Sequence, residues 1–236
     1  MLNTILHKAN ERGHAQHGWL DSYHSFSFAN YFNPEKINFG ALRVINEDRV
    51  LPGEGFATHS HNNMEIISIP LSGALEHKDS MGNTSVIQSG EIQVISAGTG
   101  ILHSEYNASH EELVHFLQIW IIPNQNNVTP RYQQIKFDEK RLNEFQQIVS
   151  PNPNDEGAWI HQQAWFSLGH FNQLAPIEYK LHDRNNGVYV FIIQGEAMVG
   201  DSKLLDQDAL GITGETAVKI TPAKTDTRIL LIEVPM

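Results

Sequence analysis

The sequence predicts an all-β fold with two similar halves, and three observations support this prediction. Short runs rich in Ile, Val, Leu and Phe recur from residue 39 onward, and each run stops at Gly, Asn, Asp or Pro. Such runs between turn residues are typical of the strands of a β-sandwich or β-barrel. Runs of the same kind resume after residue 157. A duplicated β architecture is therefore the simplest interpretation, on pattern rather than on aligned identity.

Residues 39–122 are expected to form one all-β unit, because strand-like runs follow one another there with only short turns between them. The runs are FGALRVINEDRV, MEIISIPLSG, ALEHKDSMGN, SVIQSGEIQVISAG and ELVHFLQIWIIP. The comparable runs of the second half are AWFSLGHF, PIEYKLH, GVYVFIIQGEAMVG, DALGITG, TAVKITP and TRILLIEVP.

One segment between these runs predicts a short helix at residues 137–149. Its apolar residues recur at helical spacing, and Asp138 is placed to cap the first turn. These apolar residues are Phe137, Leu142, Phe145 and Ile148 or Val149. SPNPNDEG then reads as a connection. We therefore expect an N-terminal domain at 1–135, a helix and linker at 136–157, and a C-terminal domain at 158–236.

The composition excludes several classes of function. The chain has 236 residues, with 16 basic and 27 acidic residues and a formal charge of -11, which disfavours binding to nucleic acid or anionic membranes. It has no cysteine, so disulfides, thiolate nucleophiles and iron–sulfur clusters are excluded, and any metal must be held by nitrogen and oxygen ligands. No run approaches the roughly 18 apolar residues of a membrane helix, and a cytoplasmic location is the default expectation.

Two short motifs place potential metal ligands two residues apart. GEGFATHSHNNME at 53–65 contains His59 and His61, and GEIQVISAGTGILHSEYN at 90–107 contains His103 and Glu105. On a strand, residues two apart share a face, so each segment offers a same-face pair. Three imidazoles and a carboxylate suit a first-row transition metal and leave positions open for other ligands. A buried polar network without a metal is the alternative.

These motifs resemble the two metal-binding motifs of the cupin superfamily. SAGTGILHSE, with LDSYHSFSFANYF and LVHFLQIWI, resembles in particular the pirin family of bicupins, over residues 19–122. The resemblance implies two packed antiparallel β-barrels of the double-stranded β-helix or jelly-roll type, with one metal in the N-terminal barrel. The second half is similar only in strand pattern, and its His161, His170 and His182 are widely spaced.

The resemblance leaves two candidates for the carboxylate ligand. The general cupin pattern implies Glu65, whereas the pirin pattern implies Glu105, and both have suitable strand parity. We expect the ligands to be His59, His61, His103 and Glu105. Glu65 and Gln118 remain candidates to support the ligands or line the pocket. Fe(II) is the expected metal, with Cu, Mn, Ni, Co or Zn as alternatives.

Pirins resemble quercetin 2,3-dioxygenases, which implies a flavonol substrate opened with O2 and Glu105 as general base. A different class of function is a metal- or redox-sensing regulator that binds a transcription factor or a metabolic enzyme. A third is an isomerase or epimerase that works without oxygen. The chain is expected to be a monomer. His24 and the aromatic residues Phe26, Phe28, Tyr31 and Phe32 are expected to close the barrel rather than to line a pocket.

Overall fold

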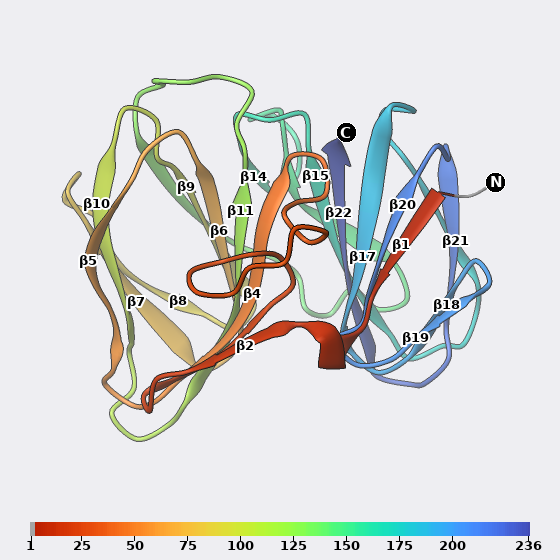
Figure 1. Cartoon of the computed structure of the whole chain (residues 1–236), viewed down its shortest axis with the longest axis horizontal. Helices are drawn as coiled ribbons and strands as arrows, with labels where there is room; N and C mark the ends of the chain where they lie inside the picture. Colours follow the sequence, from red (N-terminus) through yellow and green to blue (C-terminus); the bar gives the residue numbers. More distant parts are fainter. Residues whose placement is uncertain (1–2) are drawn as a thin grey trace.

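The computed structural model describes residues 3–236, which form two β-barrel-like halves lying side by side (Figure 1). Each half combines one seven-stranded and one four-stranded sheet, and the only helical element of the described chain is a 3-10 turn at Ala9–Glu11. The expected all-β class with two barrels is therefore confirmed. No helix in residues 3–236 is long and apolar enough to cross a membrane.

The N-terminal half is built from eleven strands. Its seven-stranded sheet has the order β12-β9-β6-β11-β4-β3-β2, and its four-stranded sheet has the order β5-β10-β7-β8. The strands of the larger sheet are β2 (Gly13–Gln16), β3 (Leu20–His24), β4 (Leu42–Val50), β6 (Glu65–Ser72), β9 (Glu91–Ser96), β11 (Val114–Ile121) and β12 (Arg131–Lys136). Those of the smaller sheet are β5 (Gly55–His61), β7 (Ala74–Asp79), β8 (Thr84–Gln88) and β10 (Ile101–Asn107).

The C-terminal half repeats this architecture. Its larger sheet has the order β1-β20-β17-β22-β15-β13-β14 and its smaller sheet the order β16-β21-β18-β19. The larger sheet contains β1 (Asn3–His7), β13 (Phe145–Ser150), β14 (Ala158–Trp159), β15 (Trp165–Phe171), β17 (Asn186–Gln194), β20 (Ala209–Thr213) and β22 (Thr227–Pro235). The smaller one contains β16 (Ile177–Lys180), β18 (Ala197–Val199), β19 (Ser202–Leu204) and β21 (Ala217–Pro222).

The first strand of the chain belongs to the second half. β1 pairs antiparallel with β20, and the chain then crosses to β2 in the other half (Figure 1). Asp208 fixes the crossing, because its carboxylate accepts from Lys8 Nζ and from the Ala9 amide, each at 2.8 Å. The division of the chain into two domains at residues 136–157 stays a proposal. In it, β1 comes from the N-terminal domain and completes the larger sheet of the C-terminal half.

The expected helix at 137–149 is wrong. Residues 138–141 form a turn in which Asp138 Oδ1 accepts the Lys140 amide at 3.0 Å, so Asp138 caps a turn and not a helix. Asn143 follows with φ of 64°, which interrupts any right-handed helix, and β13 then pairs with β15. Ladder hydrogen bonds and burial of Ile148 and Val149 in the shared core outweigh the local helical spacing.

The two halves share one apolar core between their larger sheets. Leu42, Leu117 and Ile119 come from the N-terminal sheet and pack in one cluster with Phe166 and Tyr189 of the C-terminal sheet. Burial of this cluster is the main hydrophobic contribution to holding the barrels together. Because much of the apolar surface is buried between the two halves, the inside of the N-terminal barrel can hold polar side chains.

Candidate metal centre

Strand pairing brings the three predicted histidines to one place. His59 of β5 lies directly opposite His103 of β10, and His61 lies two residues further along β5. The ring centroids of His103 lie 4.4 Å from those of His59 and 5.0 Å from those of His61. One ring nitrogen of each histidine lies within 4.8 Å of the others. The alternation of side chains along strands is the reason for this grouping.

The hydrogen bonds of the histidines leave nitrogen atoms free for a cation. Nδ1 of His59 lies 2.8 Å from the carbonyl oxygen of Ala57, which can only accept, so Nδ1 carries the proton and Nε2 keeps its lone pair. Both ring nitrogens of His103 are buried without a partner. Buried polar atoms are normally paired, and an unpaired imidazole nitrogen beside two further imidazoles fits a divalent metal.

The environment of the site keeps the rings of His103 and His61 neutral. Burial, and next the neighbouring His59, lowers the pKa of His103 to about 3. Burial, followed by the charge of His103, lowers the pKa of His61 to about 4. Neutral imidazole is the form that binds metal, so the site is prepared for a metal at neutral pH.

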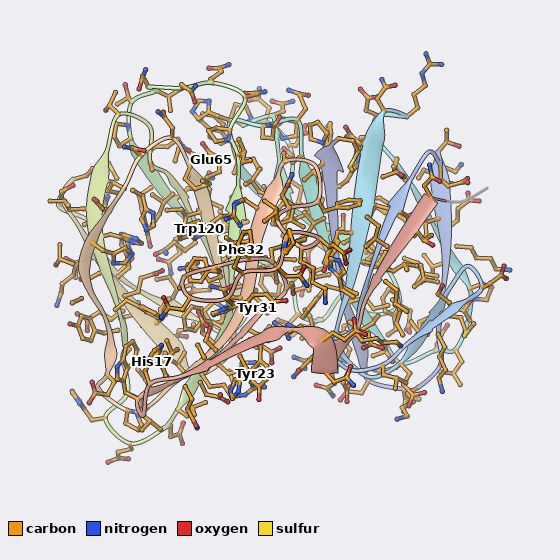
Figure 2. The ribbon with its side chains drawn as sticks, viewed as in Figure 1. His17, Tyr23, Tyr31, Phe32, Glu65 and Trp120 are labelled. Atoms are coloured by element: carbon orange, nitrogen blue, oxygen red, sulfur yellow. The ribbon has the colours of Figure 1, made fainter. Side chains whose placement is uncertain are left out.

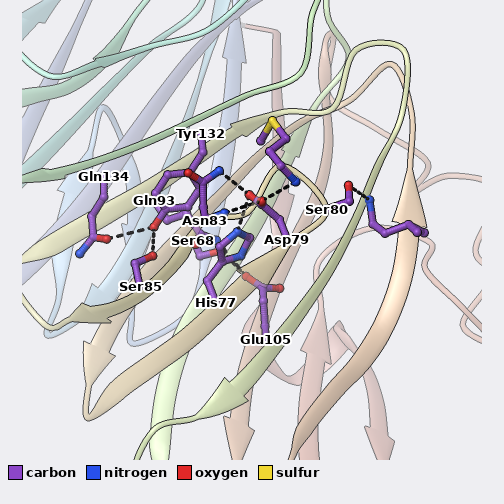
Figure 3. Close-up of polar contacts among 12 residues, drawn as sticks. Ser68, His77, Asp79, Ser80, Asn83, Ser85, Gln93, Glu105, Tyr132 and Gln134 are labelled. Carbon is purple, nitrogen blue, oxygen red and sulfur yellow. Dashed lines mark hydrogen bonds and ion pairs between the residues drawn. The ribbon is translucent and has the colours of Figure 1, made fainter.

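Glu105 is a buried carboxylate held by three donors. Ser68 Oγ and Gln93 Nε2 donate to Oε1 at 2.9 and 3.0 Å (Figure 3). Gln118 Nε2 donates to Oε2 at 2.7 Å. The pairing of β10 with β5 shifts by one residue between His103 and Glu105, as in a β-bulge. Glu105 thereby groups with His103 and His77, within 4.8 Å of each, and not with the other two histidines.

Glu65 occupies a different environment. It begins β6 in the larger sheet and is labelled in Figure 2. Its carboxylate accepts a hydrogen bond from Ser96 Oγ at 2.7 Å, and Arg131 is a nearby positive charge. Burial raises the pKa of Glu65 to about 7. Within residues 3–236, it joins no metal-type group with the histidines. Of the two candidate carboxylates, Glu105 is the one beside His103, and Gln118 is its direct hydrogen-bond partner.

His77 is a member of the site that we did not anticipate from the sequence. It is fully buried on β7, opposite Glu105, and its Nε2 lies 3.0 Å from Asp79 Oδ2 (Figure 3). Tyr132 stacks on its ring at a centroid distance of 4.8 Å. The stretch EHKDS places a histidine and a carboxylate two apart, as HSE does, and this repeated spacing was the available signal.

A cavity of about 300 Å3 adjoins the centre. His59, Glu105 and Gln118 form one part of its wall. The apolar part of the wall is formed by Trp19, Leu20, Phe28, Phe56 and Trp120. Trp120, labelled in Figure 2, meets the ring of His61 edge to face at 4.9 Å. The cavity therefore joins the metal-type ligands to aromatic surfaces suited to a flat ligand.

The remaining wall is polar and comes mainly from the N-terminal segment. Ser22 Oγ donates to Asp48 and lies 2.8 Å from His24 Nε2, which links three buried cavity residues. Burial raises the pKa of Asp48 to about 7. We expected His24 and Phe28 only to close the barrel, whereas both line the cavity. Phe32, by contrast, is 74% exposed.

The histidines of the second half do not form a comparable cluster among the described residues. His182 Nδ1 lies 2.9 Å from Glu233, and His170 Nε2 lies 2.6 Å from Asp226. Trp165 stacks on His182. Each histidine thus has its own carboxylate or aromatic neighbour, at separate places in the fold.

Comparisons with known proteins agree with this geometry. The family model described as Pirin matches residues 6–121, and the one described as quercetinase C-terminal cupin domain matches residues 147–234. A quercetin 2,3-dioxygenase of Escherichia coli K12 is 44% identical over 234 residues, which is 98% of each chain. A putative quercetin 2,3-dioxygenase of Zymomonas mobilis is 40% identical over 222 residues, 93% of each chain.

Solved structures give the same result. The crystal structure of a bacterial pirin from Escherichia coli in complex with nickel(II) has a TM-score of 0.93 and 42% identity. The match covers 98% of this chain and 99% of that one. The two barrels are thus those of a bicupin, and the chain belongs to the pirin family.

Proposed function

We propose that this protein is a metal-dependent dioxygenase that opens a flavonol ring with O2. The observation that carries the proposal is a group of three imidazoles, one with both nitrogens unpaired, beside an aromatic-walled cavity of about 300 Å3. Relatives named quercetin 2,3-dioxygenase at 44% and 40% identity over nearly the whole chain support the same activity.

The proposed ligands are His59, His61, His103 and Glu105. The histidine nitrogens lie within 4.8 Å of one another, and Glu105 lies within the same distance of His103. Nitrogen and oxygen donors of this kind suit Fe(II), which is our first choice, and also nickel, the metal named for the related pirin structure. When bound there, the metal supplies positive charge beside the substrate's 3-hydroxyl group and the redox chemistry that O2 requires.

Glu105 has the position of a general base. Its carboxylate lies in the cavity wall, where it can take the proton of the 3-hydroxyl group. Ser68, Gln93 and Gln118 donate hydrogen bonds to it, which fixes the direction of the carboxylate. Trp120 and Phe56 provide flat surfaces for the aromatic rings and keep water away from the reacting atoms.

Oxygen consumption with quercetin tests the proposal. The protein is loaded with one equivalent of Fe(II), and the metal content is measured before each assay. We expect uptake that scales with bound metal and is lost in His59→Ala. His110→Ala, which changes an exposed histidine, serves as the matched control and should retain uptake. Absence of uptake by fully loaded protein would refute the dioxygenase and favour a metal-dependent regulator.

A cytoplasmic location completes the proposal, since a chain without cysteine has no need of an oxidising compartment.

A further inference from the structure

We propose that His77 and Asp79 form a hydrogen-bonded chain behind the metal ligand His103. In this chain, His103 binds the metal through Nε2 and donates its Nδ1–H to Nδ1 of His77, and His77 donates its Nε2–H to Asp79. The inference rests on the proposed metal site but not on the proposed reaction. His77 and Asp79 are positioning residues, because they act on the metal through His103.

Asp79 is held as an ionised acceptor. Its Oδ1 accepts from the backbone amides of Met81 and Asn83 at 2.9 and 3.0 Å, and its Oδ2 accepts from Asn83 Nδ2 at 2.8 Å (Figure 3). Three donors thus point at the two carboxylate oxygens of Asp79. An ionised carboxylate has no proton to donate, so the contact at 3.0 Å requires the hydrogen on His77 Nε2.

The tautomer of His77 follows from this contact. With the hydrogen on Nε2, the neutral ring keeps a lone pair on Nδ1, which is buried and has no partner. The ring cannot turn freely, because Tyr132 stacks on it with an interplanar angle of 20°. Tyr132 is in turn held by Ser85 and by Gln134 (Figure 3). The structure thus presents a fixed acceptor inside the barrel that lacks a donor.

His103 offers the missing donor. It lies opposite Asp79 across the β7–β10 pairing, diagonal to His77, with the two imidazole centroids 5.6 Å apart. Ring nitrogens of His77 and His103, with an oxygen of Glu105, all lie within 4.8 Å of one another. Both nitrogens of His103 are buried and unpartnered.

Three ring nitrogens lack a partner: His77 Nδ1, His103 Nδ1 and His103 Nε2. A metal ion at His103 Nε2 and a hydrogen bond between the two Nδ1 atoms would pair all three. His59 already shows the same arrangement, with Nδ1–H bonded to Ala57 and Nε2 left for the metal. If His103 follows it, His103 Nδ1–H requires an acceptor, and His77 Nδ1 is the acceptor without a donor. Direct ligation of the metal by His77 would instead draw the ion away from His59 and His61, which belong to the other ligand group.

The chain should tighten metal binding. A carboxylate-backed hydrogen bond to the distal nitrogen of a ligating imidazole fixes its tautomer and raises its basicity, and loss of such a partner costs about 10–100-fold in metal affinity. The same contact fixes the ring direction of His103, whose position determines where the metal lies relative to Glu105.

The test measures binding of Cu(II) by competition with a chelator and records pulsed electron paramagnetic resonance spectra, which detect the distal nitrogen of each bound imidazole. His77→Phe keeps an aromatic ring against Tyr132 but removes the acceptor. His77→Gln keeps one acceptor and one donor, so it is the conservative rescue. His110→Phe makes the same exchange at an exposed histidine and is the matched control.

We expect His77→Phe to bind one equivalent about 10–100-fold more weakly, with a changed distal-nitrogen signal from one imidazole. His77→Gln should remain close to the wild type, and His110→Phe should be unchanged. Wild-type affinity and spectra in His77→Phe would overturn the proposal. Loss of one coordinated nitrogen in both His77 variants would also overturn it, because His77 would then be a ligand. This test uses no substrate, so its result does not depend on the proposed reaction. If the loaded protein consumes no oxygen with quercetin, the proposed function is refuted and the proposal about His77 is not affected.

Discussion

The sharpest prediction concerns the two candidate carboxylates, which are exchanged separately as Glu105→Gln and Glu65→Gln. Glu105 accepts three hydrogen bonds from Ser68, Gln93 and Gln118, so an amide at this position must turn an NH2 group toward at least one donor. The least disruptive orientation faces Gln118 Nε2, which is itself a donor, while Gln118 Oε1 lies 2.8 Å from Ser68 Oγ and shares the single hydroxyl hydrogen of Ser68 with Glu105. One hydrogen bond to a charged group is then lost.

The expected magnitudes follow from these contacts. Loss of a hydrogen bond to a charged group destabilises the metal-free protein by about 1.5–3 kcal/mol, measured by urea unfolding. Loss of a general base lowers kcat for oxygen uptake by about 10²–10⁴-fold. Glu65→Gln should keep the metal content and kcat, because Glu65 bonds to Ser96 and not to the histidine group. Full metal and turnover in Glu105→Gln, combined with their loss in Glu65→Gln, would refute the reasoning.

Three further changes test other parts of the structure. Gln118→Leu removes the 2.7 Å donor to Glu105 and should lower kcat for oxygen uptake about tenfold with little change in KM; an unchanged kcat would contradict the role of Gln118. Burial, followed by the charge of Lys36, lowers the pKa of His7 from 6.5 to about 4. Between these pH values the unfolded chain binds a proton that the folded protein does not, so the free energy of unfolding should fall as the pH drops from about 6.5 towards about 4. His7→Phe should flatten this decline in urea titrations, and an identical slope would exclude His7 as a source. A Cβ on Gly55 would lie 2.3 Å from the Glu105 carbonyl oxygen, so Gly55→Ala should push β5 away from β10. We expect the free energy of unfolding to fall by about 1–3 kcal/mol and metal binding to weaken. Native metal affinity in this variant would be inconsistent with the tight pairing.

Strand parity explains what the sequence could predict about the site. His59 and His61 share a face for a local reason, and the two motifs lie on strands that pair directly, so the grouping with His103 follows from alternation. Parity could not separate Glu65 from Glu105. The separation depends on which sheet each strand joins and on the shift in pairing after His103, and both are non-local properties.

The failures have the same origin. Helical spacing at 137–149 is a local signal, whereas the pairing of β13 with β15 and the turn at Asn143 depend on partners elsewhere in the chain. Asn143 Oδ1, for example, accepts the amide of Asn172 at 2.8 Å. The pairing of β1 with β20 joins residues about two hundred positions apart, and no periodicity within either segment encodes it. His24 and His77 were assigned no part in the site because a single histidine on a strand carries little information about what faces it.

The contents of the barrels explain why a duplicated fold has one centre of this type in the described chain. The second barrel is filled largely by apolar side chains, among them Val190, Leu210 and Leu231, which pack into one cluster and supply no ligand. Its buried Glu233 is already bonded to Tyr179 and Asn186. At the corresponding place the first barrel buries Ser68, Gln93, His77, His103 and Glu105. Buried polar groups are costly unless they are paired, so this barrel gives up part of its own hydrophobic core for a prepared site. The apolar cluster shared between the two larger sheets offsets that cost. Function therefore depends on what fills each barrel, and the second half contributes the apolar surface against which the polar barrel is packed.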